Sequence, residues 1–363
     1  MDDHRRRVVG GRYSFTITFL LVNEIEALGS ADPTIFIDPN EQLSEAARRR
    51  IRESVPASTR RAYAGDWRRF THWCDDHQRS HLSATAATLA EYVSHLADEG
   101  KAASTIERAM AAIAVAHAAA DLPPPHTRPA RAVVRRHRAE LAEGGRGVRK
   151  AKALTITALR AMVDTLDVST LAGVRDRALI VVGFALGARR SELAALNIAD
   201  LAFTGHGLQI AIRRSKTDKE SVGRSTALPY TSRPATCPVR TMQAWLDALA
   251  ARGETSGPVF RRIDRYGNLG RVPHGRGEAS GRITGQAVAI IVRRTALRAG
   301  LDAASAFSGH SLRRGFATET HRRGKNPLRI ARHGGWKDGS ATLAGYIEDA
   351  DQWEDNALTD VGL

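Results

Sequence analysis

The feature that most constrains the fold is a nearly continuous apolar segment, VRDRALIVVGFALGA, at residues 174–188. This segment is predicted to be a helix, and a helix that is apolar around most of its circumference has to be buried. No segment of the chain reaches the about 18 apolar residues that a membrane span requires. Residues 15–22 (FTITFLLV) are followed by acidic residues rather than by a signal-peptide cleavage site. We therefore expect a globular domain packed around residues 174–188, a cytoplasmic location and no membrane partner.

Helices and one small sheet are expected around this buried helix. In the run LQIAIRR, Leu208, Ile210 and Ile212 fall on one face of a strand. The short turns on either side of this run favour antiparallel pairing of the strand with its neighbours. The three strand-like runs (LAFT, LQIAIRR, STALPY) occupy residues 201–204, 208–214 and 225–230. Helical patterns occupy residues 155–166, 239–251, 284–299, 312–323 and 328–332, and residues 261–282 indicate a loop or ragged hairpin.

The preceding part of the chain is predicted to be a separate, all-helical domain. Tyr63, Trp67, Phe70 and Cys74 form an apolar stripe at helical spacing. Further helical patterns cover residues 86–97, 104–119 and 130–141. We predict a mainly α protein with four parts: an extension (1–40), a helical domain (41–143), a Gly-rich basic linker (144–153) and an α+β domain (154–363).

The charge of the chain favours a polyanionic partner. Its 363 residues include 54 Lys and Arg against 39 Asp and Glu, a formal net charge of +15. Both predicted domains carry an excess of basic residues, which suits a nucleic acid held from two sides. The alternative is a solvated basic face with no such partner. Two cysteines without metal-ligand spacing predict neither a disulfide framework nor a zinc site.

Several charged residues form a pattern that suits phosphoryl chemistry. Arg189 and Glu192 lie three residues apart where the buried helix ends, and His310 and Arg313 share one helix face. Two arginines on one phosphate would stabilise a pentacoordinate transition state. Lys216, in the turn between two strands, could protonate a leaving alkoxide, and His310 could assist proton transfer from a nucleophile. Tyr346 supplies that nucleophile.

The order Arg189, Lys216, His310, Arg313, Trp336, Tyr346 resembles the catalytic series of the tyrosine recombinases, the phage-integrase family. Tryptophan stands, as in Cre, where most members have histidine. The resemblance covers about residues 40–355 and implies a SAM-like core-binding domain and a catalytic domain that together form a C-shaped DNA clamp.

The resemblance also implies a role for each residue. Arg189 and Arg313 would bind the scissile phosphate, with Glu192 orienting active-site groups. Lys216 would be the general acid, His310 would assist the tyrosine, and Trp336 would pack beside the phosphate. Tyr346 would form a 3′-phosphotyrosyl link in a Holliday-junction pathway that uses no metal, ATP or other cofactor. The candidate DNA-binding residues are Arg60, Arg61, Arg68, Arg69, Arg135, Arg136, Arg149 and Lys150.

Some assignments have alternatives. Lys219 competes with Lys216, His333 competes with Trp336, and Glu192 could be a structural ion pair. The gap between Trp336 and Tyr346 is one residue longer than expected, and its two glycines, at positions 339 and 345, suggest slack in the chain.

The expected partners are double-stranded DNA target sites and further copies of the chain. Two copies would bind each site and four would act on synapsed DNA. The protein would be of bacterial or phage origin and associated with the nucleoid. The stretch DADQWEDNAL would dock on a neighbouring subunit through Trp353 and Leu358. A type IB topoisomerase and a non-catalytic DNA-binding relative are the alternative functions.

Overall fold

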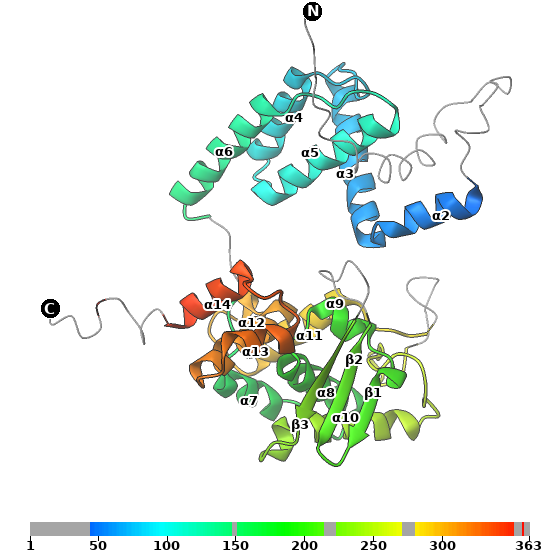
Figure 1. Ribbon diagram of the computed structural model, residues 1–363, viewed down its shortest axis with the longest axis vertical. Coiled ribbons are helices and arrows are strands. Elements are labelled where there is room, and N and C mark those ends of the chain that lie inside the picture. Colours follow the sequence, from blue (N-terminus) through cyan, green and yellow to red (C-terminus); the bar gives the residue numbers. More distant parts are fainter. Residues whose placement is uncertain (1–43, 147–150, 214–222, 271–279, 352–357, 359–363) are drawn as a thin grey trace, which may run out of the picture. The chain divides into compact units, whose positions relative to one another are not determined.

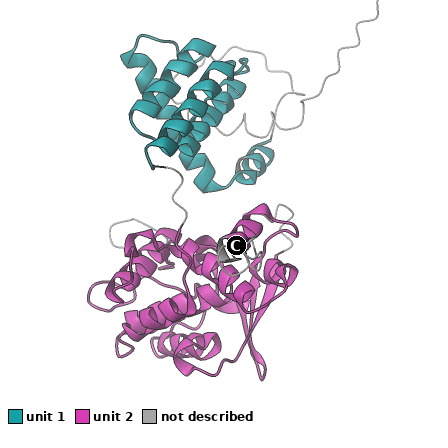
Figure 2. Ribbon diagram, turned by 90° about the vertical axis from the view of Figure 1, so that its left-hand side faces the viewer, with its two compact units in different colours: residues 1–149 teal, residues 150–363 magenta. Residues whose placement is uncertain are grey.

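The computed structural model describes residues 44–146, 151–213, 223–270, 280–351 and 358. The chain divides into two compact units, residues 1–149 and 150–363 (Figures 1 and 2). No helix among the described residues combines the length and the apolar character needed to cross a membrane.

Unit 1 is helical, as the sequence predicts. Thr85 caps α4 by accepting a hydrogen bond from the backbone N–H of Thr88. The apolar stripe of α3 is buried through Trp67, Phe70 and Cys74, and Phe70 packs edge-on against Tyr92 of α4. The helices of this unit are α2 (Glu45–Ser54), α3 (Ala57–Asp76), α4 (Ala86–Asp98), α5 (Ala103–Ala119) and α6 (Arg128–Glu143).

Unit 2 surrounds its most apolar helix with other helices and a sheet. Helix α8 (Leu171–Ala185) is buried along most of its length, which confirms the prediction from its composition. The other helices are α7 (Ile156–Asp164), α9 (Arg190–Ala195), α10 (Pro238–Ala250), α11 (Gly285–Arg298), α12 (Gly309–Arg322), α13 (Pro327–Gly334) and α14 (Ala341–Asp351). Three short 3-10 turns cover Ile198–Asp200, Pro234–Thr236 and Ala304–Ala306.

The sheet of unit 2 has three antiparallel strands in sequential order. They are β1 (Leu201–Thr204), β2 (Gly207–Ile212) and β3 (Arg224–Pro229). Ile210 pairs with Leu201 on one side and with Thr226 on the other. Leu208, Ile210 and Ile212 are all buried, so the alternation predicted the correct inner face. The expected ragged hairpin is represented by two isolated bridges, Arg261 with Arg282 and Ile263 with Leu269.

The end of α8 differs from the sequence prediction. The helix ends at Ala185, three residues before the predicted limit. Gly187 adopts a left-handed conformation (φ +56°), and a Cβ there would lie 2.6 Å from Cδ1 of Phe316. A glycine therefore permits the sharp turn that ends α8 and starts α9 at Arg190.

Candidate active site

Helix α12 places His310 and Arg313 on one face. Ser308 caps the helix, because its hydroxyl accepts a hydrogen bond from the backbone N–H of His310 and its own N–H donates to Ser311. The cap fixes the first turn, and residues three apart then project side by side.

Arg313 is the most deeply buried cation of the site, with 2% of its surface exposed. Its Nη1 donates to the carbonyl oxygens of Gly187 at 2.6 Å and Gly334 at 2.5 Å. Its guanidinium carbon lies 3.6 Å from the centre of the Trp336 ring, within cation–π range. Burial, followed by the charge of Arg189, lowers the pKa of Arg313 to about 9. Nη2 has no hydrogen-bond partner among the described residues, so a buried donor is available for an anion.

Arg189 and Glu192 are held together at the start of α9. The Arg189 Nη1 lies 2.6 Å from Oε1 of Glu192, and the Arg189 backbone N–H donates to Oε2 at 3.1 Å. The Glu192 carboxylate is buried, while the Arg189 side chain remains 19% exposed. Glu192 thus fixes an arginine whose outer edge still reaches solvent.

A third arginine belongs to this cluster, although the sequence analysis did not identify it. Arg224 begins β3, and its Nη2 lies 3.4 Å from Oε2 of Glu192. Burial, only partly offset by the charge of Glu192, lowers the pKa of Arg224. An arginine beside a polar turn has no distinguishing pattern in the sequence, and only the fold brings it to Glu192.

The segment that carries Tyr346 packs against the same helix as His310. After α13, Gly335 adopts a left-handed conformation (φ +67°), and the Trp336 N–H donates to Ala331 at 2.8 Å. Helix α14 packs on α12, with Leu343 buried and Tyr346 half-buried against a small apolar cluster. The interpretation of the two glycines as slack is wrong for Gly345, which lies inside α14, whereas Gly339 occupies the turn before it.

His310 and Tyr346 meet directly. The imidazole Nε2 lies 2.6 Å from the phenol oxygen, and the Trp336 ring stands edge-on to the phenol with 6.3 Å between centres. Burial, followed by the charges of Arg313, Arg314, Arg189 and Arg190, lowers the pKa of His310. A neutral imidazole can accept the phenol proton, so the tyrosine is paired with a base.

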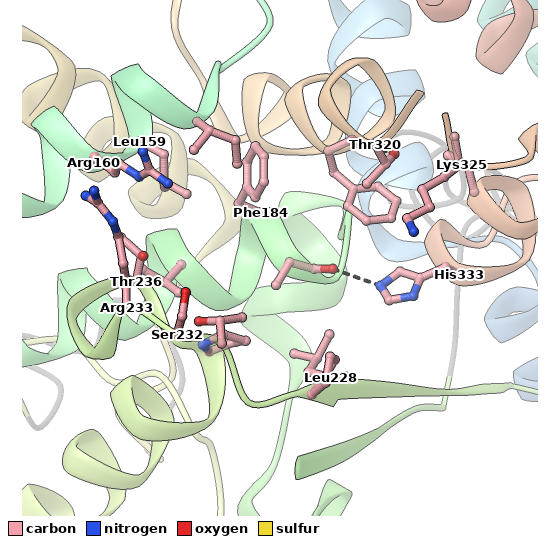
Figure 3. A pocket seen from close by; sticks show the side chains of 18 of the residues that line it. Leu159, Arg160, Phe184, Leu228, Ser232, Arg233, Thr236, Thr320, Lys325 and His333 are labelled. Carbon is pink, nitrogen blue, oxygen red and sulfur yellow. Dashed lines mark hydrogen bonds between the residues drawn. The ribbon is translucent and has the colours of Figure 1, made fainter. Parts of the chain in front are cut away.

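Of the two candidates for one position, the structure brings Trp336 and not His333 to Arg313. The His333 Nε2 bonds to the Ala185 carbonyl at 2.8 Å, and its ring stacks on Phe316. This histidine lines a cavity of about 560 Å³ (Figure 3). The cavity has apolar walls that include Phe184 and Leu228, with basic side chains at Arg160, Arg233, Lys325 and Arg329.

The structure describes only some of the remaining predicted site residues, and these differ in exposure. Lys216, Lys219, Arg149 and Lys150 lie outside the described residues. In unit 1, Arg61, Arg68 and Arg135 are exposed and Arg60 is half-buried. Arg69 pairs with buried Asp66, and Arg136 pairs with Glu140 at 2.9 Å. The described residues contain no group of three or more His, Cys, Asp or Glu that could hold a metal ion.

Comparisons with known proteins identify the family. The phage integrase family model matches residues 152–352, and the model of its N-terminal SAM-like domain matches residues 50–120. An integrase/recombinase XerD homologue from Selenomonas ruminantium is 36% identical over 329 residues, which cover 89% of this chain and 90% of the relative. The chain belongs to the phage integrase family.

Other members of this family of tyrosine recombinases extend the comparison. The Cre recombinase of Escherichia phage P1 is 24% identical over 292 residues, covering 78% of this chain and 82% of Cre. The fold resembles XerH bound to its palindromic difH substrate, with a TM-score of 0.58, 15% identity and coverage of 96% and 95%. It also resembles a lambda integrase dimer bound to a core site, with a TM-score of 0.52, 15% identity and coverage of 81% and 90%.

Proposed function

We propose that this integrase-family chain is a site-specific DNA recombinase in which Tyr346 is the nucleophile. The contact that carries the proposal is the 2.6 Å approach of His310 Nε2 to the Tyr346 oxygen, in a site with buried Arg313 and the partly buried Arg189 and Arg224. The phenolate oxygen attacks the scissile phosphorus, and the bond to the 5′-oxygen breaks. The product is a 3′-phosphotyrosyl link and a free 5′-hydroxyl, so the phosphodiester energy is conserved for rejoining through a Holliday junction.

The described residues divide this chemistry between them. Neutral His310 accepts the phenol proton as the attack begins. Arg313, through its unpaired Nη2, and Arg189, through its exposed edge, bind the non-bridging phosphate oxygens and stabilise the charge of the transition state. Trp336 closes one side of the phosphate site and holds the Arg313 guanidinium against its ring. Lys216, which lies outside the described residues and follows β2 in the sequence, protonates the leaving 5′-oxygen.

Residues 41–143 act as the core-binding domain, 144–153 as the linker and 154–363 as the catalytic domain. The exposed arginines of unit 1 contact the DNA backbone, which explains the positive charge of a domain with no catalytic residue. Two copies bind each double-stranded target site, and four act on two synapsed sites in the cytoplasm, on the nucleoid.

The acidic and apolar C-terminal stretch from Asp349 to Leu358 joins neighbouring copies. The cavity of Figure 3 suits such a segment, because its walls are apolar and its charged side chains are basic. Trp353 or Leu358 would fill the cavity, while the acidic residues between them would face Arg233, Lys325 and Arg329. The similarity to a XerD homologue, over 89% of this chain and 90% of the relative, supports recombination over relaxation by a topoisomerase.

A suicide substrate tests this function. Duplexes that bind the protein are selected from a random library, nicked near the centre of the selected site and incubated with the protein. On a denaturing gel we expect a covalent protein–DNA adduct that forms equally well in EDTA. Tyr346→Phe should form none, whereas Tyr230→Phe, which alters an exposed tyrosine of the same unit, should behave as wild type. Adduct formation by the Tyr346 variant would disprove the assignment of the nucleophile.

A further inference from the structure

Arg224 occupies an unusual place for an arginine. It is the first residue of β3, yet only 16% of its side chain is exposed. A buried guanidinium is costly unless carboxylates or carbonyls meet it. Its partners therefore indicate what this burial accomplishes.

The partners of Arg224 come from its own strand and from two helices, α9 and α13. Its Nη2 approaches Oε2 of Glu192 in α9, the carboxylate that also binds the backbone N–H and the side chain of Arg189. Its Nη1 donates to Thr226 at 2.8 Å and to the carbonyl oxygen of His333 in the last turn of α13. The Arg224 side chain thus links Glu192, which holds Arg189, to the end of α13.

The end of α13 is also where Arg313 and Trp336 are held. The carbonyl next to that of His333 belongs to Gly334 and accepts from Arg313. Gly335 lies directly against the Arg224 side chain, since a Cβ at this position would be 2.6 Å from Nε and 3.0 Å from Cδ. Trp336 follows at once, so the position of its ring depends on a backbone that Arg224 contacts on one side.

The charges around Glu192 also link Arg224 to Arg189. Three arginines, at positions 189, 224 and 313, lie near one carboxylate, which leaves an excess of positive charge that a phosphate would neutralise. Arg224 shares Oε2 of Glu192 with the backbone of Arg189. Without Arg224, the carboxylate would interact more strongly with Arg189 and reduce the attraction of that arginine for phosphate.

We infer that Arg224 is a positioning residue for strand cleavage, which holds the Arg189–Glu192 pair and the Arg313–Trp336 pair in one fixed arrangement. It acts through Glu192 and through the backbone of residues 333–335, without touching the DNA. This inference rests on the proposed function.

The test separates cleavage from binding. Single-turnover adduct formation is measured with protein in excess over the nicked duplex, and duplex affinity is measured separately. We expect Arg224→Gln to form adduct about 100-fold more slowly, the loss that follows from small displacements of catalytic groups, with affinity within about 3-fold of wild type. Arg224→Lys should restore part of the rate, since it keeps the charge and loses the fork.

Two further variants keep the test decisive. Arg213→Gln alters an exposed arginine directly after β2 that pairs with Asp200, and should change the rate by less than about 2-fold. If Arg224→Gln does not fold, Thr226→Val replaces it. This change removes one acceptor of Arg224 and the hydroxyl's own 3.3 Å hydrogen bond to the His333 carbonyl, and should slow adduct formation about 5-fold.

The outcomes separate this inference from the proposed function. Wild-type protein without adduct would overturn the function. Wild-type adduct together with an unimpaired Arg224→Gln or Thr226→Val variant would overturn the positioning role alone. A loss of duplex affinity equal to the loss of rate would also overturn it, because Arg224 would then be a DNA-binding residue.

Discussion

The imidazole Nε2 of His310 lies 2.6 Å from the phenol oxygen of Tyr346, although 36 residues separate them in the chain. Helix α14 packs on α12 and presents the tyrosine to a histidine of the same chain. The four arginines near His310 add to the effect of burial in lowering its pKa, so the ring is neutral and can accept a proton. The proposed nucleophile and its proposed base therefore lie within hydrogen-bonding distance of each other.

Replacing His310 should slow cleavage and change its pH dependence. The wild-type rate should rise as the imidazole loses its proton, with the midpoint of the rise below pH 6.5, the ordinary histidine value, because burial and the nearby arginines lower the pKa. His310→Gln should lower the rate of adduct formation about 100-fold and remove this rise. His206→Gln, in the exposed turn between β1 and β2, is the control. A rise with pH that persists in His310→Gln would assign the titration to another group.

Trp336 packs over Arg313, and we expect its indole N–H to donate to the phosphate; two variants separate these contributions. Trp336→Phe keeps a ring over Arg313 and loses the indole N–H, so we expect adduct formation about 100-fold slower with little change in unfolding free energy. Trp336→Ala should in addition destabilise unit 2 by about 3–5 kcal/mol, since the side chain is buried. Wild-type activity in Trp336→Phe would leave this residue a packing role only.

The sequence predicted most elements of the fold because their causes are local. The apolar composition of residues 174–188 and the alternation through Leu208, Ile210 and Ile212 each follow from one stretch of chain. The pairing of His310 with Arg313 likewise follows from helical spacing. The end of α8 was predicted wrongly because it depends on Gly187 meeting Phe316, a contact over more than 120 residues.

The site was predicted less completely for the same reason. Spacing favoured Trp336 over His333, but it could not reveal the left-handed turn at Gly335 or the bond from His333 to the Ala185 carbonyl, which determine where the two rings lie. Arg224 could not be found at all, because its partners Glu192 and His333 lie 32 and 109 residues away. Residues of this kind can be identified only from the tertiary structure.

Glu192 should be important for stability as well as for activity. Glu192→Gln leaves Arg189 and Arg224 without their shared carboxylate, and we expect the free energy of unfolding to fall by about 3 kcal/mol. Asp338→Asn removes the partner of Arg332 in an exposed pair of the same unit and should cost less than about 1 kcal/mol. Denaturant titrations of both variants measure the two losses of unfolding free energy. Equal losses would mean that Glu192 is only one ion pair among many.

Unit 1 should lose stability in acid through His117. This fully buried ring accepts the Ala84 N–H at Nε2 and bonds to the Ile113 carbonyl through Nδ1, so it is neutral. Burial lowers its pKa, and the unfolded chain therefore binds more protons between the folded pKa and about 6.5. The stabilisation is complete above pH 6.5 and declines as the pH falls towards the folded pKa.

Hydrogen exchange of α3 to α5 measures this effect in unit 1 alone. Protection should decrease on acidification below about pH 6.5, after correction for the intrinsic exchange rate. His117→Gln, whose amide oxygen can still accept the Ala84 N–H, should show a weaker dependence. An unchanged dependence in this variant would place the titrating group elsewhere.

Two neighbouring arginines of α3 should affect DNA binding differently. Arg68 is exposed, whereas Arg69 is paired with Asp66, a buried carboxylate that also binds Arg108 at 2.6 Å. Each phosphate contact contributes about −0.9 to the slope of log affinity against log salt concentration. Arg68→Gln should therefore make the slope shallower by about one unit and weaken binding to all sequences alike. Arg69→Gln should change the slope less and lower the melting temperature of unit 1, because Asp66 loses a partner. Binding titrations at several salt concentrations, combined with thermal unfolding, distinguish the two. If Arg68→Gln leaves the slope unchanged, the exposed face of α3 does not contact the DNA backbone at this residue.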